Sequence, residues 1–182
     1  MSRVIAFSCA HICTPETQID LQDHNYNYDN IRALLEIVAD KTPDFLINLG
    51  DFTEPRYEDK KVSEKLIFKE IPLYWDMHKY GVKVRRLNGN HDADEFGKNI
   101  NFIQIDEVRY EHGHQLINLR DRMSRKEYAE KVHESTKDIR FKLVHGHTHM
   151  PQEGNPLDVG SITFTGTYGE IIDGKEFYLR KV

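Results

Sequence analysis

The sequence has few cysteines and no long hydrophobic run, and both absences exclude classes of protein. Its 182 residues include only Cys9 and Cys13, which is too few for a disulfide framework, and a bridge between such close positions would strain their loop. We therefore expect reduced thiols. No stretch approaches the roughly 18 apolar residues of a membrane span, and the N-terminus lacks the features of a signal peptide. These observations predict a cytoplasmic protein without a membrane-bound segment.

The charge and the length narrow the choice further. The net charge of −5 gives no broad attraction to nucleic acid, although a local basic patch could hold phosphate. The chain has no repeat, no low-complexity tract and no linker. With 38% hydrophobic residues, it is long enough for one domain with a real core and too short for two. We expect a single domain over residues 1–182, and nothing in the sequence bears on its oligomeric state.

Strand and helix patterns alternate in the N-terminal half. Short apolar runs at residues 4–8 and 45–49 predict buried strands. The apolar spacing between them predicts a helix over about residues 28–40 that stops near Pro43. Together these segments predict a βαβ unit.

The next segment predicts a helix that starts near Glu58 and is interrupted at Pro72, because proline cannot continue a helix. Its apolar positions are Val62, Leu66 and Phe68. Alternating apolar residues over 82–87 then predict another strand.

The C-terminal half is expected to be more antiparallel. Ser124 and Glu127 form a capping-box signature for a helix over about residues 124–138, and an apolar run then leads into His145. Asp173-Gly174 joins two further β runs as a hairpin turn. The whole pattern predicts a layered α/β fold with its chemistry on loops at the ends of strands.

Four polar clusters each follow a predicted strand. They are Cys9-Ala10-His11, Gly50-Asp51, Gly89-Asn90-His91-Asp92 and Gly146-His147-Thr148-His149. Imidazole, carboxylate and amide groups in this concentration suit divalent ions such as zinc, iron or manganese. One His-x-His alone often has a purely structural role, but four clusters in this arrangement favour a metal centre.

The order of these clusters, with His112-Gly113-His114 between the third and the fourth, resembles the calcineurin-like metallophosphoesterase superfamily. Within it, the short chain is most similar to the compact phosphodiesterase branch. The resemblance implies an α/β/β/α sandwich of mixed sheets flanked by helices. It also implies two metal ions per chain, of zinc, iron or manganese, and hydrolysis of a phosphoester bond.

The resemblance also implies a ligand set. One metal would bind Cys9, His11, Asp51 and His149. The other would bind Asp51, Asn90, His112 and His147. Asp51 would bridge the two ions, and His112 is favoured over His114 as the ligand from its segment.

The resemblance implies a mechanism in which hydroxide held between the two ions attacks phosphorus. His91 would be a catalytic donor to a phosphate or leaving-group oxygen, and Asp92 would orient it. We expect a small phosphoester substrate, with nucleotide derivatives as one class.

Cys9 departs from the family pattern, which has aspartate there. If its thiolate binds metal, it favours zinc or iron over magnesium at the first site. Alternatively, Cys9 is a small buried thiol that does not bind metal, so the first site is weak or empty and only the second site is active. A third alternative is a redox role shared with Cys13. A cysteine-nucleophile phosphatase is disfavoured, because such enzymes have an arginine six positions later and this chain has Pro15 and Ile19.

Other readings of function remain. The chain could be a non-catalytic or weakly catalytic scaffold, as the retromer subunit of the same fold mainly is, or a protein or nucleotide phosphomonoesterase. His145 is expected only to support its loop, and no function is expected for His24, His78 and His133. After the fourth cluster, where the family often has Asn-Pro-Gly-Ser, this chain has Asp158-Val159-Gly160-Ser161.

Overall fold

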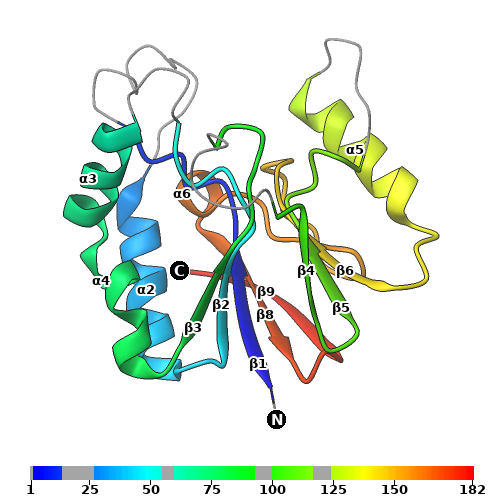
Figure 1. The fold of residues 1–182 in the computed structure, drawn as a ribbon. Helices are drawn as coiled ribbons and strands as arrows, with labels where there is room; N and C mark the ends of the chain where they lie inside the picture. The colour runs from blue at the N-terminus through cyan, green and yellow to red at the C-terminus, as the bar shows by residue number, and fades with distance from the viewer. Residues whose placement is uncertain (1, 14–26, 55–59, 93–99, 117–123) are drawn as a thin grey trace.

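Two β-sheets lie face to face in the computed structural model, with helices on the outer face of each (Figure 1). The structure describes residues 2–13, 27–54, 60–92, 100–116 and 124–182. The strand order is β3-β2-β1-β8-β9 in one sheet and β4-β5-β6-β7 in the other. This arrangement confirms the predicted α/β/β/α sandwich of mixed sheets.

The first sheet is built around a βαβ unit, as predicted. Its strands are β1 (Arg3–Phe7), β2 (Phe45–Asn48), β3 (Lys83–Arg86), β8 (Thr167–Ile172) and β9 (Glu176–Lys181). β1, β2 and β3 are parallel, whereas β8 pairs antiparallel with β1 and with β9. Helix α2 (Tyr28–Lys41) connects β1 to β2; the Asn27 side chain caps its start, and Thr42 ends it in a left-handed conformation.

The β8–β9 hairpin is also as predicted. Asp173 and Gly174 are the central residues of its turn, in which the Lys175 N–H donates to the Ile172 carbonyl at 2.9 Å. Both have positive φ angles, 51° and 59°, as in the turns that match the twist of the flanking strands.

The second predicted helix is divided at Pro72, as expected. It consists of α3 (Lys60–Glu70) and α4 (Pro72–Asp76), followed by a 3₁₀ turn, η2 (Met77–Tyr80). Of the apolar positions named for this helix, Phe68 is 67% exposed, whereas the neighbouring Ile67 is buried. Glu58 lies outside the described residues, as does the side chain of Val62.

The second sheet contains the main departures from the sequence prediction. Its strands are β4 (Phe102–Ile105), β5 (Val108–Glu111), β6 (Lys142–His145) and β7 (Leu157–Asp158). The β4–β5 hairpin was not predicted, because β4 alternates between exposed and half-buried residues and carries no buried apolar run. The expectation of an antiparallel C-terminal half is wrong for β5, β6 and β7, which run parallel.

The reason for the parallel pairing is helix α5 (Arg125–Thr136), which acts as a crossover between β5 and β6. The predicted capping box is present at its start: the Ser124 side chain accepts from the Glu127 N–H, and the Glu127 carboxylate accepts from the Ser124 N–H at 2.8 Å.

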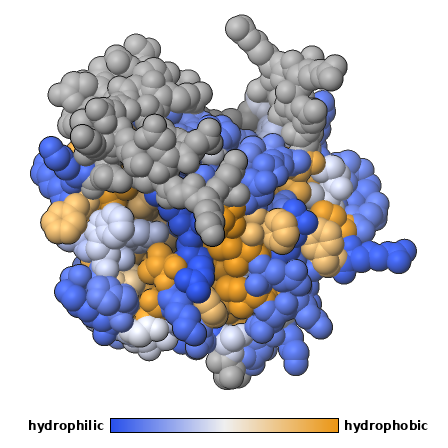
Figure 2. All heavy atoms as spheres, viewed as in Figure 1, coloured by the Kyte–Doolittle hydropathy of each residue, from blue (hydrophilic) through white to orange (hydrophobic). Residues whose placement is uncertain are grey.

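The hydrophobic core has two parts, one on each face of the first sheet. Helices α2, α3 and α4 cover one face through residues such as Ile31, Leu34 and Ile67. The second sheet covers the other face through Tyr110 and Val144. Hydrophilic residues cover much of the face seen in Figure 2, and a band of hydrophobic residues is visible near its middle. Among the described residues, no helix is both long and apolar enough to cross a membrane.

Candidate metal centre

The predicted ligands lie on loops at one end of the two sheets. Because β1, β2 and β3 run parallel, their carboxyl ends reach the same edge. The loops there carry Cys9, His11, Asp51 and Asn90. The second sheet adds His112 after β5, and His147 and His149 after β6.

Five of these residues have a left-handed backbone. Their φ angles lie between 45° and 72°, and they are Cys9, His11, Asp51, His147 and His149. Residues with a side chain rarely adopt this conformation, and such strain persists where surrounding contacts hold it, typically at functional sites. Five of the seven predicted ligands thus have this strained backbone, whereas Asn90 and His112 do not.

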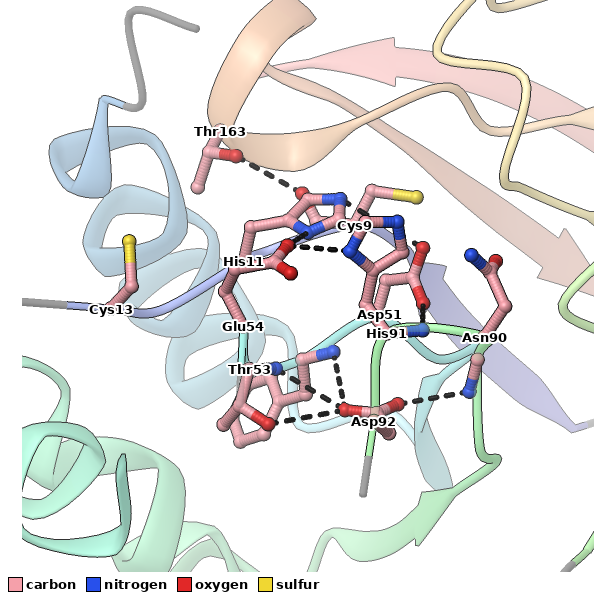
Figure 3. A network of polar contacts seen from close by, with 12 residues as sticks. Cys9, His11, Cys13, Asp51, Thr53, Glu54, Asn90, His91, Asp92 and Thr163 are labelled. Atoms are coloured by element: carbon pink, nitrogen blue, oxygen red, sulfur yellow. Dashed lines mark hydrogen bonds and ion pairs between the residues drawn. The ribbon is translucent and has the colours of Figure 1, made fainter. Parts of the chain in front are cut away.

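Backbone and hydroxyl hydrogen bonds hold Cys9 in this conformation. Its N–H donates to the Gly50 carbonyl at 3.0 Å. Its own carbonyl accepts from the Ser161 hydroxyl at 2.9 Å and the Thr163 hydroxyl at 3.0 Å (Figure 3). The loop after β1 is thus held by the loop after β2 and by the segment that leads into β8, the two strands next to β1 in the sheet.

Two motif glycines let the loops approach one another closely. A Cβ at Gly89 would overlap the carboxylate and the backbone nitrogen of Asp51, and a Cβ at Gly146 would overlap the Ser8 side chain. Glycine is required at both positions for steric reasons.

Asp51 lies between the two groups of ligands. On one side, its Oδ2 is 3.0 Å from His112 Nε2 and 3.9 Å from His147 Nδ1. His112 Nε2 is also 3.1 Å from His147 Nδ1 and 3.3 Å from Asn90 Oδ1. Four donors therefore converge as the second predicted metal site requires.

On the other side, Asp51 Oδ2 is 3.8 Å from His11 Nε2, which is 3.4 Å from His149 Nε2. The Cys9 sulfur joins this group: the ligand atoms of Cys9, His11 and His149 all lie within 4.8 Å of one another. Zinc binds imidazole nitrogen at about 2.0–2.1 Å, so tetrahedral ligand atoms stand about 3.3 Å apart. The residues present fit an ion on each side of Asp51.

The electrostatics of Asp51 suit a bridging ligand. Burial alone would raise its pKa, but His112, His147 and His11 more than offset that effect, and the pKa lies well below its ordinary value. For His112, burial is the largest single effect and lowers the pKa, but Asp51, Asp92 and the Leu49 carbonyl together outweigh it, so the net shift is upward. Asp51 is therefore an anion in the folded protein.

Cys9 is a buried thiol beside this carboxylate. Burial first, and then the charge of Asp51, raise its pKa well above the ordinary value, so without a cation the thiol form is favoured. Its sulfur lies 3.1 Å from the Ser8 hydroxyl. Cys13 lies apart from the cluster in Figure 3, and both cysteines are free.

Comparison with known proteins now decides the family. The family model described as calcineurin-like phosphoesterase matches residues 2–175. The chain belongs to the calcineurin-like phosphoesterase family. Members of this family depend on divalent metal ions, and the donor groups around Asp51 supply candidate ligands for them.

Solved structures share the fold of this calcineurin-like phosphoesterase. The phosphoesterase YfcE from E. coli is 20% identical, with a TM-score of 0.51 over 94% of this chain and 88% of that one. A single mutant of Vps29 from Entamoeba histolytica is 16% identical, with a TM-score of 0.50 over 99% and 98%. AQ665 from Aquifex aeolicus, a protein of unknown function, is 19% identical, with a TM-score of 0.51 over 90% and 91%. At these identities the likeness concerns the fold alone. No curated protein matches the chain.

Glu54 contacts His91, and the sequence analysis did not predict a role for it. Glu54 Oε2 is 2.5 Å from His91 Nδ1 and 3.0 Å from His11 Nδ1 (Figure 3). Burial would raise the pKa of Glu54, but the hydrogen bonds of the two histidines lower it to about 2. One carboxylate thus orients both a metal ligand and the candidate catalytic histidine. The sequence signal that could have identified Glu54 is its position as a carboxylate three residues after Asp51, in the same loop.

Asp92 does not have the contact that the sequence reading gave it. Its carboxylate accepts from the N–H groups of Phe52, Thr53 and Gly89 and from Arg86. It therefore holds the loops after β2 and β3 together. His91 nevertheless lies beside the predicted ligands. Its N–H donates to Asp51 Oδ1 at 2.8 Å, and its ring is 4.8 Å from that of His11.

The two histidines of the His112-Gly113-His114 segment have different surroundings. His112 is among the donor atoms around Asp51, whereas the His114 ring packs 5.3 Å from the His112 ring. Burial and then the neighbouring His112 lower the pKa of His114 to about 4. His78 is exposed on η2, and His24 lies outside the described residues.

Proposed function

We propose that this chain is a metal-dependent phosphodiesterase acting on small phosphoesters, with nucleotide derivatives as the favoured substrate class. The observation that carries the proposal is the convergence of imidazole, thiol, amide and carboxylate groups on both sides of Asp51, with His91 at its edge.

Cys9, His11, Asp51 and His149 would hold one ion. Asp51, Asn90, His112 and His147 would hold the other. Two divalent ions supply Lewis acidity there: they polarise phosphoryl oxygens and lower the pKa of bound water. The thiol of Cys9 favours zinc or iron in the first position.

The protein's own contribution is to position these groups. His91 would donate to a phosphate or leaving-group oxygen, and Glu54 would hold its ring in place through Nδ1. Asp51, as an anion, would bind both ions and so hold the two groups of ligands next to each other. Asp92 would act indirectly, through the loop that carries Asn90 and His91.

The test is hydrolysis of an aryl phosphodiester by metal-stripped protein supplied with manganese, zinc or iron. We expect turnover with at least one metal and a loss of about 10²–10⁴-fold in kcat for His91→Ala, the usual contribution of a general acid. The matched control for His91→Ala is His78→Ala, which removes an exposed histidine of η2 and should retain activity.

Two results would redirect the proposal. No turnover with any metal, and no effect of His91→Ala, would favour a scaffold of the same fold. A higher kcat/KM for the aryl phosphomonoester than for the diester would favour a phosphomonoesterase. Elemental analysis of protein purified without chelator reports the metal identity, and we expect the centre at Asp51 to account for two of the ions per chain.

A further inference from the structure

A second cluster of metal-binding side chains lies outside the centre described above. It consists of His133 on α5, His145 at the end of β6 and Asp158 at the end of β7. Asp158 Oδ2 is 3.5 Å from His133 Nε2 and 3.7 Å from His145 Nδ1. The sequence reading assigned no function to the first of these histidines and only loop support to the second.

The cluster is buried and incompletely satisfied. The side chains of His145 and Asp158 are 0% exposed, and that of His133 is 22% exposed. The Nε2 atoms of both histidines are buried and have no hydrogen-bond partner among the described residues. Buried polar atoms without partners are rare in folded proteins, and a bound cation would satisfy imidazole nitrogens in this position.

Asp158 is held in place by its own contacts. One oxygen accepts from the Gly160 N–H at 2.9 Å, and the other accepts from the Thr148 hydroxyl. A carboxylate oxygen has more than one acceptor site, so Oδ2 can bind a cation as well. The carboxylate is therefore fixed with an oxygen directed at two imidazoles, an arrangement in which ligating groups are oriented by second hydrogen bonds.

We propose that His133, His145 and Asp158 bind a third divalent cation of the zinc class, separate from the two at Asp51. Two imidazoles and one carboxylate are a donor set that zinc accepts, with water completing four ligands. The 3.5 Å between Asp158 Oδ2 and His133 Nε2 is close to the roughly 3.3 Å between ligand atoms of a tetrahedral zinc site. His145 Nδ1 lies 3.1 Å from the Gly146 carbonyl, to which it can only donate, so Nε2 is the nitrogen of this ring that can bind the ion. One ligand atom from each of the three residues lies within 4.8 Å of the others. Magnesium and calcium are disfavoured, because they prefer oxygen ligands.

The ion would have a structural role. His145 comes two residues before His147, and the Thr148 hydroxyl donates a hydrogen bond to Asp158. His133 belongs to α5, whose Tyr128 packs its ring 5.2 Å from the His147 ring. A cation at Asp158 would join α5 to the loop that carries two ligands of the main centre, and so fix the position of that loop.

The test measures metal content and not activity. Metal-stripped chains are re-equilibrated with zinc, freed of excess zinc by gel filtration and analysed for zinc per chain. We expect His133→Gln to hold one zinc fewer than the wild type and His78→Gln, a helix-borne histidine outside the cluster, to hold the same number. Equal zinc content in wild type and His133→Gln would overturn the proposal.

A second series separates this site from the main centre. In an Asp51→Asn background, where the bridging carboxylate is lost, we expect about one zinc per chain to remain and to disappear when His133→Gln is added. Cobalt(II) in place of zinc should give the visible absorption of a tetrahedral site, lost with the same substitution. Zinc that remains in the double variant would refute the assignment. His133→Ala, which favours the helix, serves if the glutamine variant does not fold.

Discussion

Glu54 is the residue whose replacement tests the site most directly. Its carboxylate contacts His91 Nδ1 at 2.5 Å and His11 Nδ1 at 3.0 Å, and its side chain is 1% exposed. Glu54→Gln keeps the shape and removes the charge. The amide oxygen can still accept from both histidines, as Oε2 does, but without the negative charge these hydrogen bonds lose their charge-assisted strength and hold the two rings less firmly.

The loss of metal affinity and of kcat expected for Glu54→Gln follows from the contacts of Glu54 with His11 and His91. Removing a carboxylate that orients a metal-binding histidine typically costs 10–100-fold in metal affinity or activity. We therefore expect zinc affinity at the first site to fall by about that factor, through His11. At saturating metal, kcat should still fall about 10–100-fold, through His91, with little change in KM.

The assay is steady-state hydrolysis of an aryl phosphodiester across a metal titration. Glu70→Gln is the matched control, because Glu70 also forms a charged hydrogen bond, to Arg32 at 2.6 Å, but on α3 away from the centre. Unchanged kcat at saturating metal together with unchanged zinc affinity in Glu54→Gln would refute the positioning role. A fall in stability alone, equal in both variants, would also refute it.

Glu54 also predicts an acid dependence of stability in the metal-free protein. Its pKa falls from 4.5 to about 2 on folding, because the hydrogen bonds of His11 and His91 outweigh burial. A lowered carboxyl pKa stabilises the fold above the unfolded value, and this contribution is lost as pH falls from about 4.5 to about 2. The shift corresponds to about 3 kcal/mol, and screening reduces it to about 1–3 kcal/mol. The difference in free energy of unfolding between wild type and Glu54→Gln should become smaller as the pH falls from about 4.5 to about 2. A difference that does not change with pH would contradict the lowered pKa of Glu54.

Three further predictions concern single positions. Gly89→Ala should abolish activity, because its Cβ would overlap the Asp51 carboxylate; full activity with normal folding would contradict this. Ser124→Ala should cost about 1 kcal/mol in urea unfolding, because the capping box of α5 is lost, and no change in the unfolding midpoint would show that the cap is not needed. Cys9→Asp should move metal preference from zinc or iron towards manganese and magnesium, and identical preference and stoichiometry in a metal titration would eliminate Cys9 as a ligand.

Much of the fold could be predicted because its signals are local. The capping box at Ser124, the Asp173-Gly174 turn and the break at Pro72 each depend on a few adjacent residues. The β4 strand was missed because its alternating exposed and half-buried residues form no apolar run. The direction of β6 was missed because pairing depends on where α5 returns the chain, which no local pattern encodes.

The sequence by itself determined the kinds of donor group and the strands that carry them, because motif spacing and hydrophobic pattern are properties of neighbouring residues. Only the tertiary structure decided which groups meet. It placed Glu54 and not Asp92 at His91, and it brought His133, His145 and Asp158 together from three separate elements. The physical reason is that these side chains leave turns, a helix and two sheets at angles fixed by packing, including the left-handed backbone of Asp51 and His147. Small changes in those angles decide which atoms lie within bonding distance.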